Sequence, residues 1–256
     1  MDPLRHLPRL DNPLAILVGS AALPLMSRWP KFATPTTSYG RAPGPLWIGE
    51  VAGRDLVVVP RHGAPHRLAP HQVNYRALID TLCQLGVQDV LASHTVGGIE
   101  PSLAPGAYAV PEQLIDYTYG RDQTFYGDAP VDHLEFGEPF TPKLREALLA
   151  GAAELSIAVT ASGTYGCTQG PRLETAAEIK RMARDGATLV GMTAMPEAAL
   201  AAERGLGYAS LCLVVNPAAG VVAEPIAIDE VRAIAHAAAP DLEKLLLAGL
   251  KSLVLG

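Results

Sequence analysis

Short runs of apolar residues alternate along this chain with longer segments in which apolar residues recur every three or four positions. The runs at 14–19 (LAILVG) and 55–60 (DLVVVP) are bounded by proline or glycine, a pattern typical of buried strands. Further runs of the same kind predict strands at 87–93, 156–163, 187–193 and 208–216.

Segments with helical periodicity lie between these runs. They predict helices at 73–86, 141–155, 175–186 and 196–205, and a last helix from Asp229 onward. Thr175 and Glu178 form a capping-box pattern at the start of the helix at 175–186, and Gly186 marks its end. Because proline disrupts a helix interior, we expect Pro240 to interrupt the last helix.

The alternation of strands and helices is typical of an α/β fold. No repeat or linker divides the chain, so we expect residues 1–256 to form a single domain with a mixed, largely parallel central sheet flanked by helices. Ligands of such sheets bind beyond the carboxyl ends of the strands. The residues with binding potential that follow the predicted strands are Gly19 and Ser20, Arg61 and His62, His94 and Thr95, Met192 and Thr193, and Asn216.

Composition and charge exclude several classes of protein. The 256 residues are 49% hydrophobic, yet no stretch of about 18 apolar residues suggests a membrane span. The net charge of −6, without a basic run, argues against non-specific nucleic-acid binding. Cys83, Cys167 and Cys212 form no CxxC motif and are expected to be reduced thiols. Since the N-terminus also lacks an apolar signal core, we expect a cytoplasmic protein.

The span 61–77 (RHGAPHRLAPHQVNYRA) raises a choice between a metal site and an anion site. His62 and His66 have a spacing that chelates a metal only on a helix, but Gly63 and Pro65 disfavour a helix there, so we expect no metal. Arg61 can hold two oxygens of one anion, and His62 adds a donor. Neither a Walker loop nor a dinucleotide fingerprint occurs, so the sequence predicts a site for one phosphate, built from separate loops that include Ser20.

Motifs in a fixed order along almost the whole chain carry a family resemblance. They are RHG…H (61–66), VNYRA (73–77), GGI…PG (97–106), QLIDYTYGRDQTFY (113–126), GEPF (137–140), GPRLETAAE (170–178), GMTAMPEAALAAERGLGYAS (191–210) and LVVN (213–216). With them the chain resembles the trimeric purine nucleoside phosphorylases, and most of all their methylthioadenosine/methylthioinosine phosphorylase branch.

The resemblance implies a reaction in which inorganic phosphate attacks the anomeric carbon of a purine nucleoside and releases a sugar 1-phosphate and a free purine. Phosphate is the co-substrate, and no metal or organic cofactor is implied. The family pattern carries phosphate binding to Ser20, Arg61, His62, Thr95 and Thr193. It also implies that Thr193 lies near the sugar and that Met192 packs under the ribose. It also implies a homotrimer with sites at the subunit interfaces, in which His133 reaches into a neighbouring site.

Two positions indicate which purine base the substrate carries. The methylthioadenosine enzymes carry a pair of aspartates after the last strand, whereas this chain has Asn216 and Ala218 there. Leu173 and Glu174 match the 6-oxopurine phosphorylases, in which the glutamate accepts from N1–H and the asparagine serves O6 and N7. The chemistry agrees, because adenine has an acceptor at N1 and a mismatched buried polar pair costs roughly 1–3 kcal/mol.

The sugar preference rests on the region of the last helix. The general 6-oxopurine enzymes place a histidine there for the 5′-hydroxyl, whereas this chain has none before His236. Ile228 could instead line an apolar pocket for a 5′-methylthio group, beside His66. The expected substrate is therefore 5′-methylthioinosine. The alternatives are a broad phosphorylase of inosine and guanosine, a methylthioadenosine phosphorylase, a nucleoside hydrolase and a non-catalytic binding protein.

Overall fold

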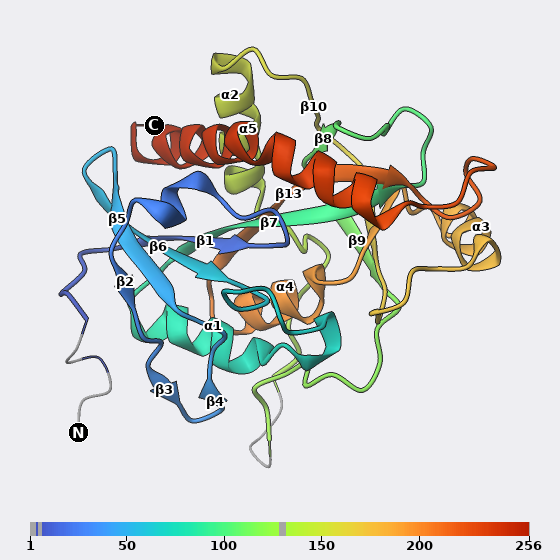
Figure 1. The fold of residues 1–256 in the computed structure, drawn as a ribbon. Coiled ribbons are helices and arrows are strands. Elements are labelled where there is room, and N and C mark those ends of the chain that lie inside the picture. Colours follow the sequence, from blue (N-terminus) through green and yellow to red (C-terminus); the bar gives the residue numbers. More distant parts are fainter. Residues whose placement is uncertain (1–3, 5–6, 128–131, 256) are drawn as a thin grey trace.

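The computed structural model describes residues 4, 7–127 and 132–255, and Figure 1 shows a sheet with helices on both faces. The strands of the described chain are β1 (Leu14–Val18), β2 (Lys31–Phe32), β3 (Thr36–Thr37), β4 (Gly40–Arg41), β5 (Leu46–Val51), β6 (Arg54–Pro60), β7 (Asp89–Gly98), β8 (Tyr108–Ala109), β9 (Gln113–Asp116), β10 (Val159–Thr160), β11 (Thr164–Cys167), β12 (Leu189–Gly191) and β13 (Gly207–Pro217). The α-helices are α1 (Tyr75–Gln84), α2 (Pro142–Glu154), α3 (Ala176–Arg184), α4 (Ala194–Glu203) and α5 (Ile228–Leu255), and two short 3-10 helices cover Pro24–Ser27 and Pro70–Gln72.

The central sheet is mixed and largely parallel, as the sequence predicts. Its main path runs β10-β8-β13-β7-β1-β6-β5-β2, and β13, β7, β1 and β6 are mutually parallel neighbours. The strands β11 and β9 form a parallel extension that joins the main path through β12, which pairs with β7 in the antiparallel sense. The carboxyl ends of β1, β6, β7 and β13 therefore lie at one edge, where the sequence predicts the ligand site.

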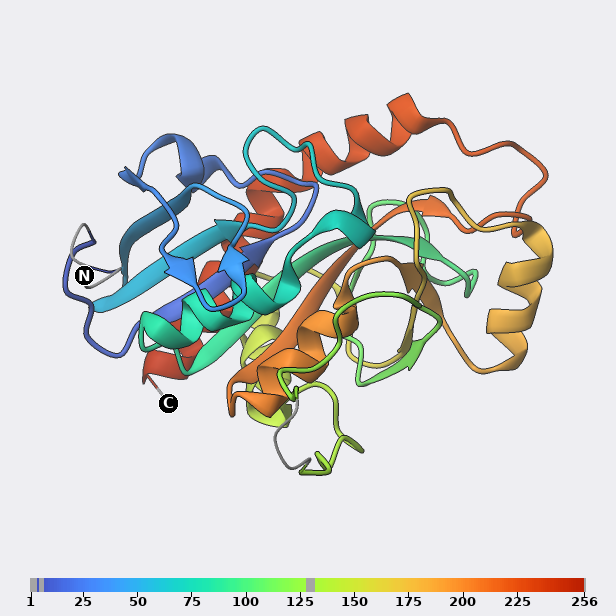
Figure 2. The same ribbon diagram turned by 90° about the horizontal axis from the view of Figure 1, so that it is seen from below.

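The two faces of the sheet bury different sets of side chains. Alternate residues of β1 point to opposite faces: Leu14, Ile16 and Val18 pack with α2 and α5, whereas Ala15 and Leu17 pack with α1 and α4. Figure 2 shows α1 and α4 on the near face and α5 behind the sheet. Strands that are buried on both faces read as unbroken apolar runs, which explains the LAILV and LVVV segments.

The helix starts follow from local sequence. The Asn74 side chain accepts from the backbone N–H of Ala77 and caps α1. The capping box of α3 is confirmed, because the Thr175 hydroxyl accepts from Glu178 N–H and the Glu178 carboxylate accepts from Thr175 N–H. Both contacts satisfy donors that a helix leaves free in its first turn.

Two expectations about the elements are wrong. The strand predicted at 156–163 is reduced to β10, and the buried strand of this region is β11, which follows Gly163 at φ +130°. Pro240 does not interrupt the last helix, since α5 continues through it to Leu255. The Pro240 ring is exposed, while Ala239 and Leu242 on either side stay buried against the sheet. Packing on the inner face thus maintains the helix despite the lost hydrogen bond.

Candidate phosphate and nucleoside site

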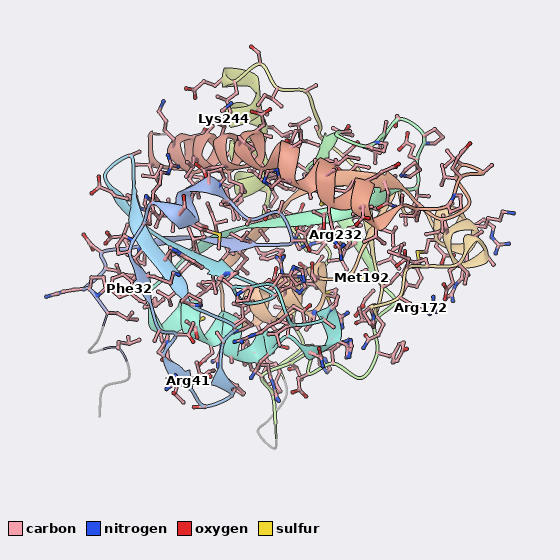
Figure 3. All side chains as sticks on the ribbon, in the orientation of Figure 1. Phe32, Arg41, Arg172, Met192, Arg232 and Lys244 are labelled. Atoms are coloured by element: carbon pink, nitrogen blue, oxygen red, sulfur yellow. The ribbon has the colours of Figure 1, made fainter. Side chains whose placement is uncertain are left out.

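One cavity at the carboxyl edge of the sheet brings together ten of the residues predicted for the site. It is lined by Ser20, Arg61, His62, His66, Thr95, Leu173, Glu174, Met192, Thr193 and Asn216, together with His94 and apolar residues such as Val96, Val190 and Val215. These residues come from six segments of the chain that are far apart in sequence. Figure 3 shows Met192 in the interior, with Arg232 of α5 on its upper side.

Arg61 is fully buried at the end of β6 and forms an ion pair with Glu197 of α4. Its Nε–H and one Nη2–H donate to Oε1 and Oε2 of Glu197, both at 2.7 Å, and Nη1 donates to the backbone oxygen of Ser93 at 3.0 Å. Burial alone would lower the pKa of Arg61, but the Glu197 carboxylate more than offsets that effect and the pKa is raised. The sequence predicted that Arg61 would hold an anion with its fork. That fork is occupied by Glu197, so only one hydrogen on each Nη is left for a ligand in the cavity that Arg61 lines.

The turn after β1 passes close over this ion pair. The backbone N–H of Gly19 donates to the Ser93 hydroxyl at 3.0 Å. A Cβ at position 19 would lie 2.6 Å from the Ser93 backbone oxygen and 3.2 Å from Arg61 Nη1. Glycine is therefore required here for close approach, and it lets Ser20 reach the cavity wall.

His62 is neutral at physiological pH. Burial, and then the positive charge of Arg61 and the neighbouring His66, lower the pKa of His62 to about 3. The Nδ1 atom lies 2.8 Å from the Leu68 carbonyl oxygen, which can only accept, so Nδ1 carries the proton. The Nε2 atom of neutral His62 is consequently an acceptor, and it becomes a donor to an anion only after protonation.

The rings of His62 and His66 are stacked, with centroids 4.3 Å apart and an interplanar angle of 7°. Stacked parallel rings do not direct their nitrogens at a common point. Burial also lowers the pKa of His66. Within residues 7–127 and 132–255, no group of three or more His, Cys, Asp or Glu side chains is placed to hold a metal ion.

Glu174 is held in the loop between β11 and α3. Its Oε1 accepts from the Thr168 hydroxyl at 2.6 Å, which leaves Oε2 available to a ligand. Leu173 lines the same cavity and is 39% exposed. Gly170 allows this loop to pass close to Met192, because a Cβ there would lie 2.5 Å from the Met192 sulfur.

Asn216 faces the cavity because of a β-bulge near the end of β13. Val214 pairs with Val96 and Asn216 pairs with Gly97, so Val215 is an extra residue in the strand. The bulge lets two successive residues, Val215 and Asn216, both line the cavity. The Asn216 amide donates to the Pro217 carbonyl oxygen at 2.7 Å, and its second N–H and its oxygen remain for a ligand.

Thr193 reaches the site from the opposite direction. Because β12 runs antiparallel to β7, with Leu189 opposite Gly98 and Val190 opposite Gly97, the chain that follows β12 runs back along β7. This places the Thr193 hydroxyl 2.8 Å from Nδ1 of His94. The expectation that the site residues follow their strands is thus right for Arg61 and Ser20. It is wrong for His94 and Thr95, which lie within β7, and for Asn216, which lies within β13.

Two predicted residues lie outside this cavity. Ile228 lines an adjoining cavity, which also contains Arg232 and His236. The residues that line both cavities are Ser20, His66, Thr95 and Val231. His236, to which the sequence analysis gave no role, thus lines this adjoining cavity. His133 is exposed and lines none of the cavities described here.

Sequence reasoning missed the buried groups that support the site. Glu197, Tyr208 and Ser93 were not recognised, although Glu197 lies within a motif quoted for the family. A buried arginine requires a countercharge, so the prediction of Arg61 after a buried strand was a signal that a carboxylate lies near it. Thr168, which holds Glu174, gave no signal in the sequence.

Comparisons with known proteins agree with this arrangement. A family model described as "Phosphorylase superfamily" matches residues 13–251. A probable S-methyl-5′-thioinosine phosphorylase of Pseudomonas syringae pv. tomato is 53% identical over 186 residues, 72% of this chain and 76% of that protein. The 6-oxopurine nucleoside phosphorylase of Pyrococcus furiosus is 37% identical over 244 residues, which are 93% of this chain and 91% of that protein.

Solved structures show the same fold. Methylthioadenosine phosphorylase from Schistosoma mansoni, in complex with adenine, superposes with a TM-score of 0.90 at 30% identity, over 96% of this chain and 93% of that one.

Within the described residues, no helix is both long enough and apolar enough to cross a membrane.

Proposed function

Because this chain belongs to the phosphorylase superfamily, we propose that it cleaves the glycosidic bond of a 6-oxopurine nucleoside with inorganic phosphate, and that its preferred substrate is 5′-methylthioinosine. The products are hypoxanthine and 5-methylthioribose 1-phosphate. The observation that carries the proposal is the single cavity in which Arg61, Glu174 and Asn216 meet.

The cavity divides into a phosphate end and a purine end. Arg61 offers its remaining Nη hydrogens, and Ser20 and Thr95 add hydroxyl groups at the same end. A phosphate held there supplies the nucleophile and also stabilises positive charge on the sugar as the bond to the purine breaks. The electron pair of that bond leaves on the purine, which takes up a proton, and the phosphate gives up its own proton as it becomes the sugar 1-phosphate dianion.

Neutral His62 presents only an acceptor at Nε2, so it can bind the protonated oxygen of a phosphate dianion but not a deprotonated one. A deprotonated oxygen beside the ring favours the charged imidazole, which donates from Nε2, and raises the pKa of His62 from its low value. Where such an oxygen lies at Nε2, phosphate binding is therefore expected to be accompanied by uptake of a proton at His62.

Glu174 and Asn216 provide the basis for choosing hypoxanthine over adenine. With Thr168 on Oε1, Glu174 presents Oε2 as an acceptor that matches N1–H of a 6-oxopurine. Asn216 retains one N–H and one oxygen for O6 and N7. Adenine would place the lone pair of N1 against the carboxylate, and such sites discriminate strongly.

The 5′-methylthio preference rests on the adjoining cavity and on the named relatives. Ile228, Val231 and Ala235 give that cavity an apolar wall, and probable S-methyl-5′-thioinosine phosphorylases are about half identical to this chain. A second candidate substrate is inosine, because His236 lines the same cavity and can bind a 5′-hydroxyl.

The proposed reaction uses phosphate as the co-substrate and calls for no metal or organic cofactor. We further propose a cytoplasmic homotrimer in which the exposed His133 of one subunit completes the site of its neighbour. Sedimentation of a fully active monomer would contradict this assembly.

The experiment that tests the reaction is incubation of the protein with 5′-methylthioinosine in buffers with and without phosphate. Hypoxanthine release that requires phosphate, with a sugar 1-phosphate detected by phosphorus NMR, is the expected result. Equal release without phosphate would indicate a hydrolase, and no release from any purine nucleoside would indicate a binding protein.

A further inference from the structure

A buried chain of polar side chains connects Arg61 to Thr193. Glu197 accepts from Arg61 and, through Oε2, from the Tyr208 hydroxyl at 2.7 Å. The Tyr208 oxygen lies 3.2 Å from Nε2 of His94, and Nδ1 of His94 lies 2.8 Å from the Thr193 hydroxyl. All five residues are at most 7% exposed, so water does not compete for these contacts.

The proton positions along this chain follow from its fixed end. The Glu197 carboxylate faces a guanidinium and only accepts, so the single proton of the Tyr208 hydroxyl points to Glu197. The Tyr208 oxygen must then accept from His94, which places a proton on Nε2. Burial, followed by the charge of Arg61 and the neighbouring His62, lowers the pKa of His94 well below its usual value, so the ring carries no second proton.

The last contact fixes the orientation of Thr193. With its only proton on Nε2, His94 presents a lone pair at Nδ1, and the Thr193 hydroxyl must donate to it. Thr193 therefore has only acceptor capacity left for the cavity that it lines. A deprotonated phosphate oxygen is also an acceptor, so no hydrogen bond can form between it and the Thr193 hydroxyl oxygen, and their lone pairs would repel each other.

We propose that His94, held by Tyr208 and Glu197, is a positioning residue that fixes Thr193 as an acceptor, so that Thr193 binds a hydroxyl group of the ligands rather than a deprotonated phosphate oxygen. This refines the sequence expectation for Thr193, which placed the residue at the phosphate and near the sugar. It rests on the proposed function, because phosphorolysis supplies such hydroxyl groups from two sources. One source is the ribose, with its 2′- and 3′-hydroxyl groups, and the other is the protonated oxygen of phosphate.

The tautomer of His94 can be measured without any turnover. Nitrogen-15 NMR of the unliganded protein, with His94 assigned from its loss in His94→Gln, distinguishes Nε2–H from Nδ1–H. The expected result is the neutral Nε2–H form, and a shift toward Nδ1–H in Tyr208→Phe, which removes the group that fixes the ring. An Nδ1–H ring or a charged ring in the wild-type protein would overturn the proposal, whether or not the protein is a phosphorylase.

Kinetics with wild-type protein and Tyr208→Phe then identify the hydroxyl group. If it belongs to the sugar, the wild-type preference for inosine over its 2′-deoxy or 3′-deoxy analogue falls about tenfold in Tyr208→Phe. If the hydroxyl group belongs to phosphate, Tyr208→Phe instead loses the preference for phosphate over sulfate, because sulfate has no proton to donate. This preference is measured by using sulfate as a competitive inhibitor against phosphate. Either loss supports the proposal, and ratios unchanged in both arms would overturn it.

A second pair of variants separates orientation from packing. A glutamine at position 94 offers an N–H to Tyr208 and an oxygen to Thr193. His94→Gln should therefore keep most of whichever preference falls in Tyr208→Phe, for inosine over its deoxy analogues or for phosphate over sulfate. His94→Phe fills the space without either group and should lose that preference. Equal ratios in the two variants would show that His94 only packs.

Discussion

Glu197 lies 136 residues from Arg61 in sequence, yet its carboxylate holds that guanidinium through two contacts of 2.7 Å, and neither side chain is exposed. A buried charge without its partner is strongly destabilising. Glu197→Gln should therefore lower the free energy of unfolding by about 3–5 kcal/mol, measured by urea denaturation.

The matched control for this change is Glu178→Gln, which weakens the exposed pair between Arg172 and Glu178. Glutamine can keep the capping box, so we expect a loss below about 1 kcal/mol. Equal losses in the two variants would contradict the role of burial.

Gly19→Ala should weaken phosphate binding more than it affects nucleoside binding. The added Cβ would meet the Ser93 backbone oxygen at 2.6 Å and must push the turn that carries Ser20 away from Arg61. We expect the KM for phosphate to rise about tenfold or more, since a displacement near 1 Å has large effects on such sites. Gly127→Ala is the control, because no atom of the described part of the chain lies within 4 Å of its added Cβ. An unchanged phosphate KM in Gly19→Ala would show that the turn tolerates a side chain.

Thr168→Val should impair the recognition of the purine and leave the shape of the site intact. Valine replaces the hydroxyl that donates to Glu174 Oε1 at 2.6 Å, so the carboxylate loses its fixed orientation. The expected loss in kcat/KM for 5′-methylthioinosine is about tenfold, the usual value of one hydrogen bond to a charged group. A variant with unaltered kcat/KM would show that Thr168 does not position Glu174.

The stability of the protein should fall as the pH drops below about 6.5, in part because of His62. The folded state lowers the pKa of His62 from 6.5 to about 3, so between these values the unfolded chain binds a proton that the folded protein does not. His62→Gln should therefore reduce the loss of unfolding free energy between pH 6.5 and pH 3 by about 3–5 kcal/mol. The control is His71→Gln, at an exposed position. Identical pH profiles for wild-type protein and His62→Gln would contradict the buried, neutral state of His62.

The sequence predicted those parts of the fold and site that depend on local pattern. Arg61 and Ser20 were found because each follows a buried apolar strand, and Glu174 and Asn216 because they lie in motifs of the family. The groups that orient them were missed, since the contacts of Glu197, Tyr208 and Thr168 are set by how distant segments pack. The errors at 156–163 and Pro240 have the same origin, because burial against the rest of the molecule outweighed local strand and helix signals.

The preference between the two methylthio nucleosides tests most directly the claim that Glu174 and Asn216 read the purine. With saturating phosphate, we expect kcat/KM for 5′-methylthioinosine to exceed that for 5′-methylthioadenosine by at least about tenfold, and Asn216→Asp to reduce this ratio. Equal or better turnover of 5′-methylthioadenosine by the wild-type protein would contradict the account.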